Sequence, residues 1–253
     1  MKRMRRIINS SILVVLFSLC HFNTSCTSNS SSSEKSHNDT ICVHDTVSIG
    51  GSFIYNLPCK VEYIHPEKSG KAILVFWLHG GVRHQDWHDF SAENHMTWVK
   101  ADEYIINYLK QAKEKAVFII PICHKASKKD CVAWIDCAYD IKQIIDDYVN
   151  NGIVDKNRVY IIGSSDGGAG VWDLAEQHGD WFAAGMPLSC SRARKTSIPM
   201  YWHSTQSEGD QTAQAKSLNS MGCKIEYEYH PDVSHGGDEI SCKDLSKLLS
   251  HTK

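Results

Sequence analysis

The chain has 253 residues, of which 42% are hydrophobic and 22% charged, so it is long enough to bury the core of one α/β domain. Its formal net charge is −2, and this becomes −6 without residues 1–25, which carry four basic and no acidic side chains. A mildly acidic body argues against nucleic acid as a partner.

The first 40 residues have the pattern of an export segment. Four basic side chains precede the apolar run Ile12–Cys20, which is too short to span a bilayer. We expect residues 1–25 to be a signal peptide. Residues 26–40 contain the serine run Ser30–Ser33 and cannot pack a core, so they are predicted to be a flexible tether. Residues 41–253 form the single predicted folded domain.

Cys26 is the candidate for lipid modification. It follows Thr24 and Ser25, small residues of the kind that precede the modified cysteine of bacterial lipoproteins, although Asn23 stands where that signal usually has an aliphatic residue. We expect an exported lipoprotein that is periplasmic or tethered to the outer membrane, and that meets the membrane only through this anchor. The alternative is an ordinary cleaved secretory peptide and a secreted protein.

The remaining cysteines suit disulfide bonds. Their even number in an exported chain favours pairing, but the connectivity is open. Cys42 with Cys59 can staple an N-terminal hairpin, and Cys131 with Cys137 or Cys123 can close a loop. A metal site built from these cysteines is not expected, because the chain has no C-x-x-C pair. The eight residues are Cys42, Cys59, Cys123, Cys131, Cys137, Cys190, Cys223 and Cys242.

The folded domain begins with strand-like patterns. Ile41–His65 carries turn signals at Gly50-Gly51 and predicts an antiparallel edge that leads into a sheet. Ala72–Leu78 is an uninterrupted apolar run, which is typical of a strand covered by helices on both faces. This strand delivers His79-Gly80-Gly81 to the carboxyl end of the sheet. A helix is predicted from about residue 98 to residue 114.

Histidines and tryptophans gather after this strand. The group is expected to form a polar and aromatic wall of a cleft, in which Gly80, His84 and Trp87 contact a ligand; the alternatives are solvent-exposed loop residues or a metal site, which we consider weaker. Its members are His79, His84, His88, His95, Trp87 and Trp98.

Strand and helix patterns alternate through the rest of the chain. This alternation predicts an α/β fold with a doubly wound, mostly parallel sheet and helices on both faces. The predicted strands are Ala116–Pro121, Val159–Ile162, Phe182–Leu188, Ile198–His203 and Lys224–Tyr229, and the predicted helices are Tyr139–Asn150, Gly168–Ala175 and Gln211–Met221.

Gly163-Ser164-Ser165-Asp166-Gly167 fits the pattern G-x-S-x-G at a strand-to-helix turn. The pattern is typical of a nucleophile elbow, in which the serine has a strained backbone and the flanking glycines avoid collisions with the neighbouring strand and helix. Alone it is a weak signal, since a glycine-rich turn without chemistry fits as well. It predicts Ser165 as a nucleophile only if a histidine and an acid follow.

Both partners follow in the order expected for a parallel α/β sheet, which is serine, acid, histidine. The candidate acids are Glu208 and Asp210, in the loop after the strand that ends at His203, and the sequence does not separate them. Asp210 can instead cap the helix that follows. His235 is the candidate base because small glycines follow it, and His203 and His230 are its competitors.

Three segments together resemble the α/β-hydrolases of the small esterase and prolyl-oligopeptidase-like type. Leu78–Gly81 is similar to their oxyanion-hole segment, Val154–Gly168 to their run into the nucleophile and Tyr229–His235 to their histidine loop. The resemblance covers roughly Val61 to the end of the chain. It implies that residues 41–253 are a catalytic domain without a cofactor, in which the N–H groups of Gly81 and Asp166 hold an oxyanion.

The expected activity is that of a carboxylesterase acting on small-molecule or glycan esters, with acetyl or feruloyl esters of polysaccharides as candidates. A prolyl-oligopeptidase-like peptidase and a non-catalytic, tethered binding protein on the same scaffold are the alternatives. The basic segment with Arg192, Arg194 and Lys195 either contacts an anionic substrate group or is a solvated connection. The sequence gives no indication of the oligomeric state.

Overall fold

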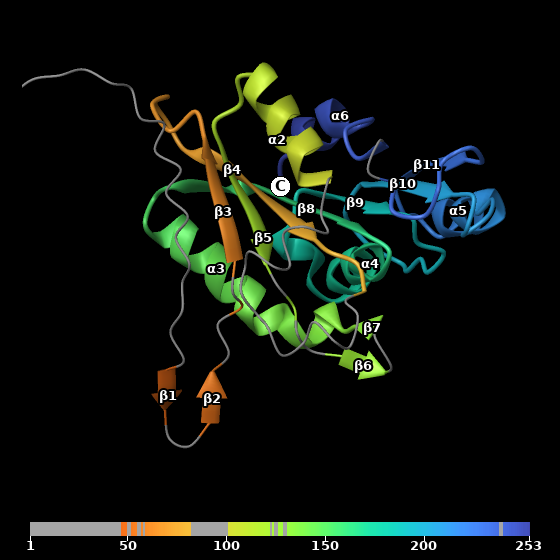
Figure 1. Ribbon diagram of the computed structural model, residues 1–253, viewed down its shortest axis with the longest axis horizontal. Coiled ribbons are helices and arrows are strands. Elements are labelled where there is room, and N and C mark those ends of the chain that lie inside the picture. The colour runs from red at the N-terminus through yellow and green to blue at the C-terminus, as the bar shows by residue number, and fades with distance from the viewer. Residues whose placement is uncertain are drawn as a thin grey trace, which may run out of the picture. The chain divides into compact units, whose positions relative to one another are not determined.

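The computed structural model describes residues 47–49, 52–54, 57, 59–81, 101–121, 123, 126–128, 131–237 and 240–253 (Figure 1). The predicted signal peptide, Cys26, the tether and Cys42 lie outside these residues, as do His84, Trp87, His88, His95 and Trp98. None of the helices in the described part of the chain combines the length and apolarity needed to cross a membrane.

A seven-stranded sheet with the order β11-β10-β9-β8-β4-β5-β3 forms the centre of the domain. Only β3 runs antiparallel to its neighbour, β5, and the other pairings are parallel. The predicted fold class, a mostly parallel sheet in an α/β fold, is therefore confirmed. The strands are β3 (Cys59–Ile64), β4 (Ala72–Leu78), β5 (Ala116–Pro121), β8 (Val154–Ser164), β9 (Ala184–Leu188), β10 (Met200–Thr205) and β11 (Ile225–His230).

Helices cover both faces of this sheet, as Figure 1 shows for α3 on one side and α2 and α6 on the other. Every residue of β4 is buried, and alternate side chains enter two separate cores, Leu74 with α3 and α4, and Val75 with α2 and α6. This is why the strand has no polar position. The helices are α2 (Ala101–Gln111), α3 (Ala138–Asn150), α4 (Asp166–His178), α5 (Thr212–Ser220) and α6 (Leu245–Ser250), with 3₁₀ turns η2 (Trp134–Cys137) and η3 (Gly179–Trp181).

The N-terminal strand pattern divides into two parts. β3 is the predicted antiparallel edge strand, paired with β5 from Cys59 opposite Pro121 to Ile64 opposite Ala116. The region around Gly50-Gly51 forms a separate two-stranded sheet of β1 (Val47–Ile49) and β2 (Ser52–Ile54), and a third small sheet pairs β6 (Ala126–Lys128) with β7 (Cys131–Val132).

The cysteines correct one expectation. Cys59 is a buried free thiol that donates a hydrogen bond to the Leu57 carbonyl at 3.2 Å, and burial raises its pKa to about 12, so the predicted bridge to Cys42 is not formed. The Sγ atoms of Cys123 and Cys137 lie 2.8 Å apart in the core. Neither Cys123 nor Cys137 is part of a disulfide bond, so the predicted bridges from Cys131 to these residues are not formed either.

Candidate active site

The site is built around the sharp turn between β8 and α4. Ser165 sits at this turn with φ +58° and ψ −120°, a conformation that side-chain-bearing residues rarely adopt. Its N–H donates to the Leu188 carbonyl of β9 at 3.0 Å, and its own carbonyl accepts the N–H of Ala169 at 3.0 Å. These bonds on both sides fix the strained residue, and its side chain is directed to the carboxyl end of the sheet.

The two glycines of the motif are required by close packing. A Cβ at Gly163 would lie 2.5 Å from the Gly167 carbonyl oxygen, and one at Gly167 would lie 1.9 Å from the Leu78 carbonyl oxygen. Both distances are far inside van der Waals contact, so any side chain would push α4 away from β4 and β8. The motif therefore has the geometry that a nucleophile elbow needs.

His235 faces Ser165 from the loop after β11. Its Nε2 atom lies 2.9 Å from Ser165 Oγ, and its side chain keeps 51% of its surface exposed, so a substrate can reach the pair. Two serines hold the loop at the next residue: the Ser164 hydroxyl donates to the Gly236 carbonyl, and the Gly236 N–H donates to Ser189 Oγ at 3.2 Å. These bonds tie the histidine loop to the ends of β8 and β9.

Glu208 is the acid that contacts His235. Its Oε1 accepts from His235 Nδ1 at 2.7 Å, while Oε2 accepts from the Thr205 N–H at 3.1 Å and the Thr205 hydroxyl at 2.5 Å. Burial opposes ionisation of this carboxyl, but the bonds from Thr205 and His235 outweigh it and lower its pKa. The carboxylate form therefore persists at neutral pH, with only 8% of the side chain exposed.

Asp210, the other candidate acid, has different partners. Its Oδ1 accepts from the Thr212 N–H at 2.8 Å and from the Tyr227 hydroxyl at 3.3 Å. The hydrogen bonds from Thr212 lower its pKa, and the residue is exposed at the start of α5. Asp210 thus accepts the N–H of Thr212, the first residue of α5, although the N-cap position itself is Gln211, while Glu208 is the acid beside His235.

The segment after β4 approaches the nucleophile through Gly80. A Cβ at Gly80 would lie 3.1 Å from Ser165 Cβ, so a side chain there would press on Ser165 and shift it by a few tenths of an ångström. The Nε2 atom of His79 accepts the Cys123 N–H at 3.0 Å, so its Nδ1 carries the proton and donates to the Gly80 carbonyl at 2.7 Å. In a trans peptide the Gly81 N–H then points the opposite way from the His79 ring.

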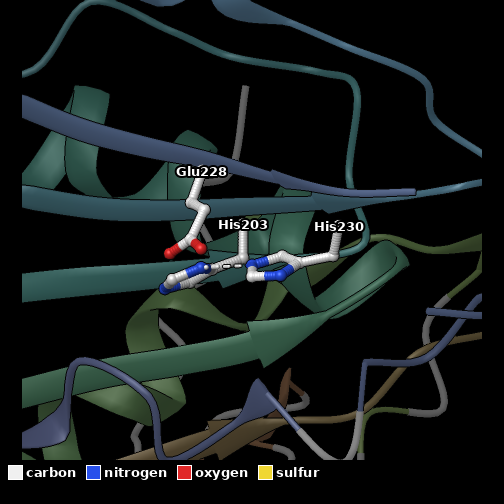
Figure 2. A group of neighbouring side chains, drawn as sticks. All are labelled: His203, Glu228 and His230. Atoms are coloured by element: carbon white, nitrogen blue, oxygen red, sulfur yellow. Dashed lines mark hydrogen bonds between the residues drawn. The ribbon is translucent and has the colours of Figure 1, made fainter. Parts of the chain in front are cut away.

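The two competing histidines contact each other instead of Ser165. His203 Nδ1 lies 3.0 Å from His230 Nε2 (Figure 2). Burial lowers the pKa of His203 to about 4 and also lowers the pKa of His230, so both rings are neutral at pH 7. Neither ring lies at the nucleophile.

A cleft of about 520 Å³ opens in front of Ser165 and His235. One side is formed by Trp134 and Ile135 of η2, and another by Cys190, Ser191 and Arg192 after β9. Arg192 reaches Asp173 of α4 with a nitrogen–oxygen distance of 2.8 Å. Arg192 is therefore part of the cleft wall, but its charge is already paired.

The sequence singled out the main side chains and missed their supports. Ser165, His235, Glu208, Asp166 and Gly80 come together in the structure, whereas His84 and Trp87 lie outside the described residues. Sequence reasoning missed Thr205, Ser164 and Ser189, which hold the acid and the histidine loop. Only their positions, at or next to the ends of strands, indicated a role.

The comparisons with known proteins agree on the fold. No protein-family model and no curated protein matches this chain. Many solved structures do. A thermostable esterase is 18% identical with a TM-score of 0.57, and the match covers 78% of this chain and 60% of that one. The feruloyl esterase module from Clostridium thermocellum complexed with sinapinate is 13% identical with a TM-score of 0.53 (77% of this chain, 83% of that one), and Est1E from Butyrivibrio proteoclasticus is 14% identical with a TM-score of 0.52 (80% of this chain, 96% of that one).

These identities are low, so the similarity shows the fold, and the chain spans only 60% of the thermostable esterase. The chain has the α/β-hydrolase fold, as its three sequence motifs led us to expect.

Proposed function

We propose that this α/β-hydrolase-fold chain is a serine hydrolase that cleaves carboxylic esters, with Ser165, His235 and Glu208 as its catalytic triad. The observation that carries the proposal is the unbroken chain of hydrogen-bond distances from Ser165 Oγ through His235 to Glu208, 2.9 Å and 2.7 Å long. A hydroxyl, a ring that can accept its proton and a carboxylate that orients the ring are the parts that acyl transfer needs.

In the first half of the reaction, Ser165 Oγ attacks the ester carbonyl carbon and His235 Nε2 takes the hydroxyl proton. Glu208 holds the proton on Nδ1 and stabilises the imidazolium. The negative carbonyl oxygen of the tetrahedral intermediate accepts hydrogen bonds from the backbone N–H groups of Asp166 and Gly81. The intermediate then expels the alcohol, which takes the proton from His235, and an acyl group remains on Ser165.

In the second half, water attacks the acyl carbon while His235 again accepts a proton. The second tetrahedral intermediate collapses, Ser165 recovers its proton from His235, and the carboxylic acid leaves. The balance is one ester and one water to one alcohol and one acid. The strained backbone of Ser165, with φ +58°, is retained through both halves of the reaction, because the hydroxyl returns to the same position at the end.

For the substrate, we infer acetyl or feruloyl esters of polysaccharides. A cleft of about 520 Å³ is larger than an acetyl group alone needs, and its half-buried lining residues Ile135 and Ala169 offer an apolar surface for an aromatic acyl group. The similarity to a feruloyl esterase module solved with sinapinate supports the aromatic candidate.

The activity is tested with p-nitrophenyl acetate and the variant Ser165→Ala. We expect the variant to lose at least about 10³-fold in kcat/KM, because the nucleophile is removed. Ser220→Ala, on the exposed side of α5, is the matched control and should keep the wild-type rate. Equal rates for wild type and Ser165→Ala would contradict the proposal and favour a non-catalytic binding protein.

A second assay separates the substrate classes. Release of acetate and of hydroxycinnamate is measured from acetylated and feruloylated glycans, alongside cleavage of a proline p-nitroanilide peptide. The proposal expects the glycan esters to be turned over and the peptide to be spared. Preferential cleavage of the peptide would instead support the prolyl-oligopeptidase-like alternative.

A further inference from the structure

A second group of chemically reactive side chains lies outside the active site, at the end of the sheet formed by β10 and β11. His203 lies on β10, and Glu228 and His230 lie on β11; His203 pairs in register with Glu228. Figure 2 shows the three side chains on the same side of the two strands, with the histidine rings pointing at each other and the carboxylate beside them. Parallel pairing thus gathers three metal-binding side chains from two strands.

The ligand atoms have the spacing of a metal site. One ligand atom from each residue lies within 4.8 Å of the others, and the two facing nitrogens are 3.0 Å apart. Two imidazole nitrogens bound to one tetrahedral Zn²⁺ lie ~3.3 Å apart, given Zn–N bonds of ~2.05 Å. A cation therefore requires the rings to separate by a few tenths of an ångström, to lose the proton between the two nitrogens and to turn so that both lone pairs point at the metal.

The other side of the His203 ring carries the support that metal-binding histidines usually have. Its Nε2 atom faces Asp244 Oδ2 at 3.3 Å, without a hydrogen bond of good geometry. A carboxylate on the far nitrogen keeps the proton there and leaves Nδ1 as a ligand. The ring is 1% exposed, so Asp244 and His230 largely determine its orientation.

Lys243 competes with a cation for the carboxylate of Glu228. Its ammonium pairs with Glu228, and both side chains are about half exposed. A lysine on a flexible stem can move into solvent, whereas the two histidines are fixed in the fold. Lys243 therefore pairs with the Glu228 carboxylate, which a divalent cation would bind in its place.

We propose that His203 Nδ1, His230 Nε2 and Glu228 bind one divalent cation of the zinc class, with Asp244 orienting His203 and with Lys243 displaced. Two imidazoles and one carboxylate are a donor set that zinc favours over magnesium, which prefers oxygen ligands. His203 lies two residues before Thr205, which is hydrogen-bonded to Glu208, and His230 lies five residues before His235. The cation fastens the strand ends from which both loops start and takes no part in acyl transfer.

The proposal is tested with the untagged full-length chain after removal of metals by a chelator. Equilibrium dialysis against Zn²⁺, with metal analysis of the protein, is expected to show one saturable equivalent that millimolar Mg²⁺ does not displace, and Zn²⁺ should raise Tm. Glu228→Gln and His230→Asn should each weaken Zn²⁺ binding at least tenfold. Asp244→Asn should weaken it about 10- to 100-fold, as removal of a carboxylate that supports a metal-binding histidine does.

Two further variants make the test specific. Glu226→Gln is the matched control, because Glu226 lies two residues earlier on β11 and pairs with Lys247 as Glu228 pairs with Lys243. It should bind Zn²⁺ as the wild type does, whereas Lys243→Met should bind more tightly because the competing charge is gone. The proposal is wrong if the wild type binds no saturable Zn²⁺, if Mg²⁺ displaces it, or if Glu228→Gln binds as tightly as Glu226→Gln.

Discussion

Glu208 meets His235 because of the turn that carries it. The N–H groups of Glu208 and Gly209 both donate to the Thr205 carbonyl, at 3.2 Å and 3.1 Å, and Gly209 has φ +69°. This tight turn folds the chain back on Thr205, so the carboxylate reaches the Thr205 N–H and hydroxyl on one side and His235 on the other. The turn, and not the residue count after β10, decides which of the two acids faces His235.

Glu208→Gln should lower kcat/KM for p-nitrophenyl acetate by about 10²- to 10⁴-fold, because a neutral amide neither stabilises the imidazolium nor fixes its tautomer. Asp210→Asn should stay within about threefold of wild type, since Asp210 contacts Thr212 and Tyr227. Steady-state kinetics on both variants decide the assignment. A large loss only in Asp210→Asn would reverse it.

The same carboxyl should make stability depend on pH. Its pKa is lower in the folded chain than in the unfolded one, so its contribution is complete above the ordinary glutamate pKa and is lost as pH falls through the lowered value. Glu208→Gln should therefore reduce the free energy of unfolding by about 1–3 kcal/mol at pH 7 and by much less near pH 3. Urea unfolding at both pH values measures this, and equal differences would contradict it.

The β8–α4 elbow depends on close contact between secondary-structure elements. Gly167→Ala would place a Cβ 1.9 Å from the Leu78 carbonyl oxygen, and the backbone cannot yield there without separating α4 from β4. We expect a loss of more than about 4 kcal/mol or failure to fold. Gly70→Ala is the control, since Gly70 has φ +84° but open space, and it should cost only about 1 kcal/mol. Similar Tm values for the two variants would contradict this account.

The histidine loop is positioned by the strand ends. Ser164→Ala removes the hydroxyl that donates to the Gly236 carbonyl, so His235 should spend less time within reach of Ser165. Ser164 is a positioning residue, and we expect kcat to fall about tenfold with KM nearly unchanged. Labelling of Ser165 by a fluorophosphonate should slow by the same factor. Slower kcat with an unchanged labelling rate would show that Ser164 acts elsewhere.

The last described residues are hydrogen-bonded to β8, the strand that leads to Ser165. The hydroxyl oxygen of Tyr160, in the middle of β8, lies 3.0 Å from the Leu249 carbonyl oxygen and 2.7 Å from that of His251, so the two carbonyls share its single proton. Tyr160→Phe should lower the free energy of unfolding by about 1–2 kcal/mol, because the one proton shared by the two carbonyls is removed while the apolar packing remains. Urea denaturation measures this; an unchanged midpoint would contradict it.

The sheet could be predicted from the sequence, because its strands are continuous apolar runs with β-branched and aromatic residues. Ala72–Leu78 and Ala116–Pro121 have the predicted bounds, while β8 begins earlier, at Val154, which pairs with Ala72 of β4 before a shift in the register. The elbow was also visible, since its glycines and serine are contiguous.

The rest depended on geometry that spacing does not encode. The separation of Glu208 from Asp210 needed the turn at Thr205, and the support of Gly236 by Ser164 and Ser189 needed three loops to be placed in space. The group of His203, Glu228 and His230 arises from the register of β10 against β11, which pairs residues 25 positions apart. A pattern of neighbouring residues in the sequence does not predict which residue lies opposite on the next strand.

Among the described residues, β11 is the terminal strand of the large sheet, and its outer side has no neighbouring strand in that part of the chain, so another polypeptide could align there. Its outward residues Glu226 and Glu228 are matched by Lys247 and Lys243. A second molecule that approached this edge would have to desolvate these charged side chains, which discourages edge-to-edge pairing at high concentration. The charged side chains of β11 should therefore influence how molecules associate in solution as well as how the chain folds.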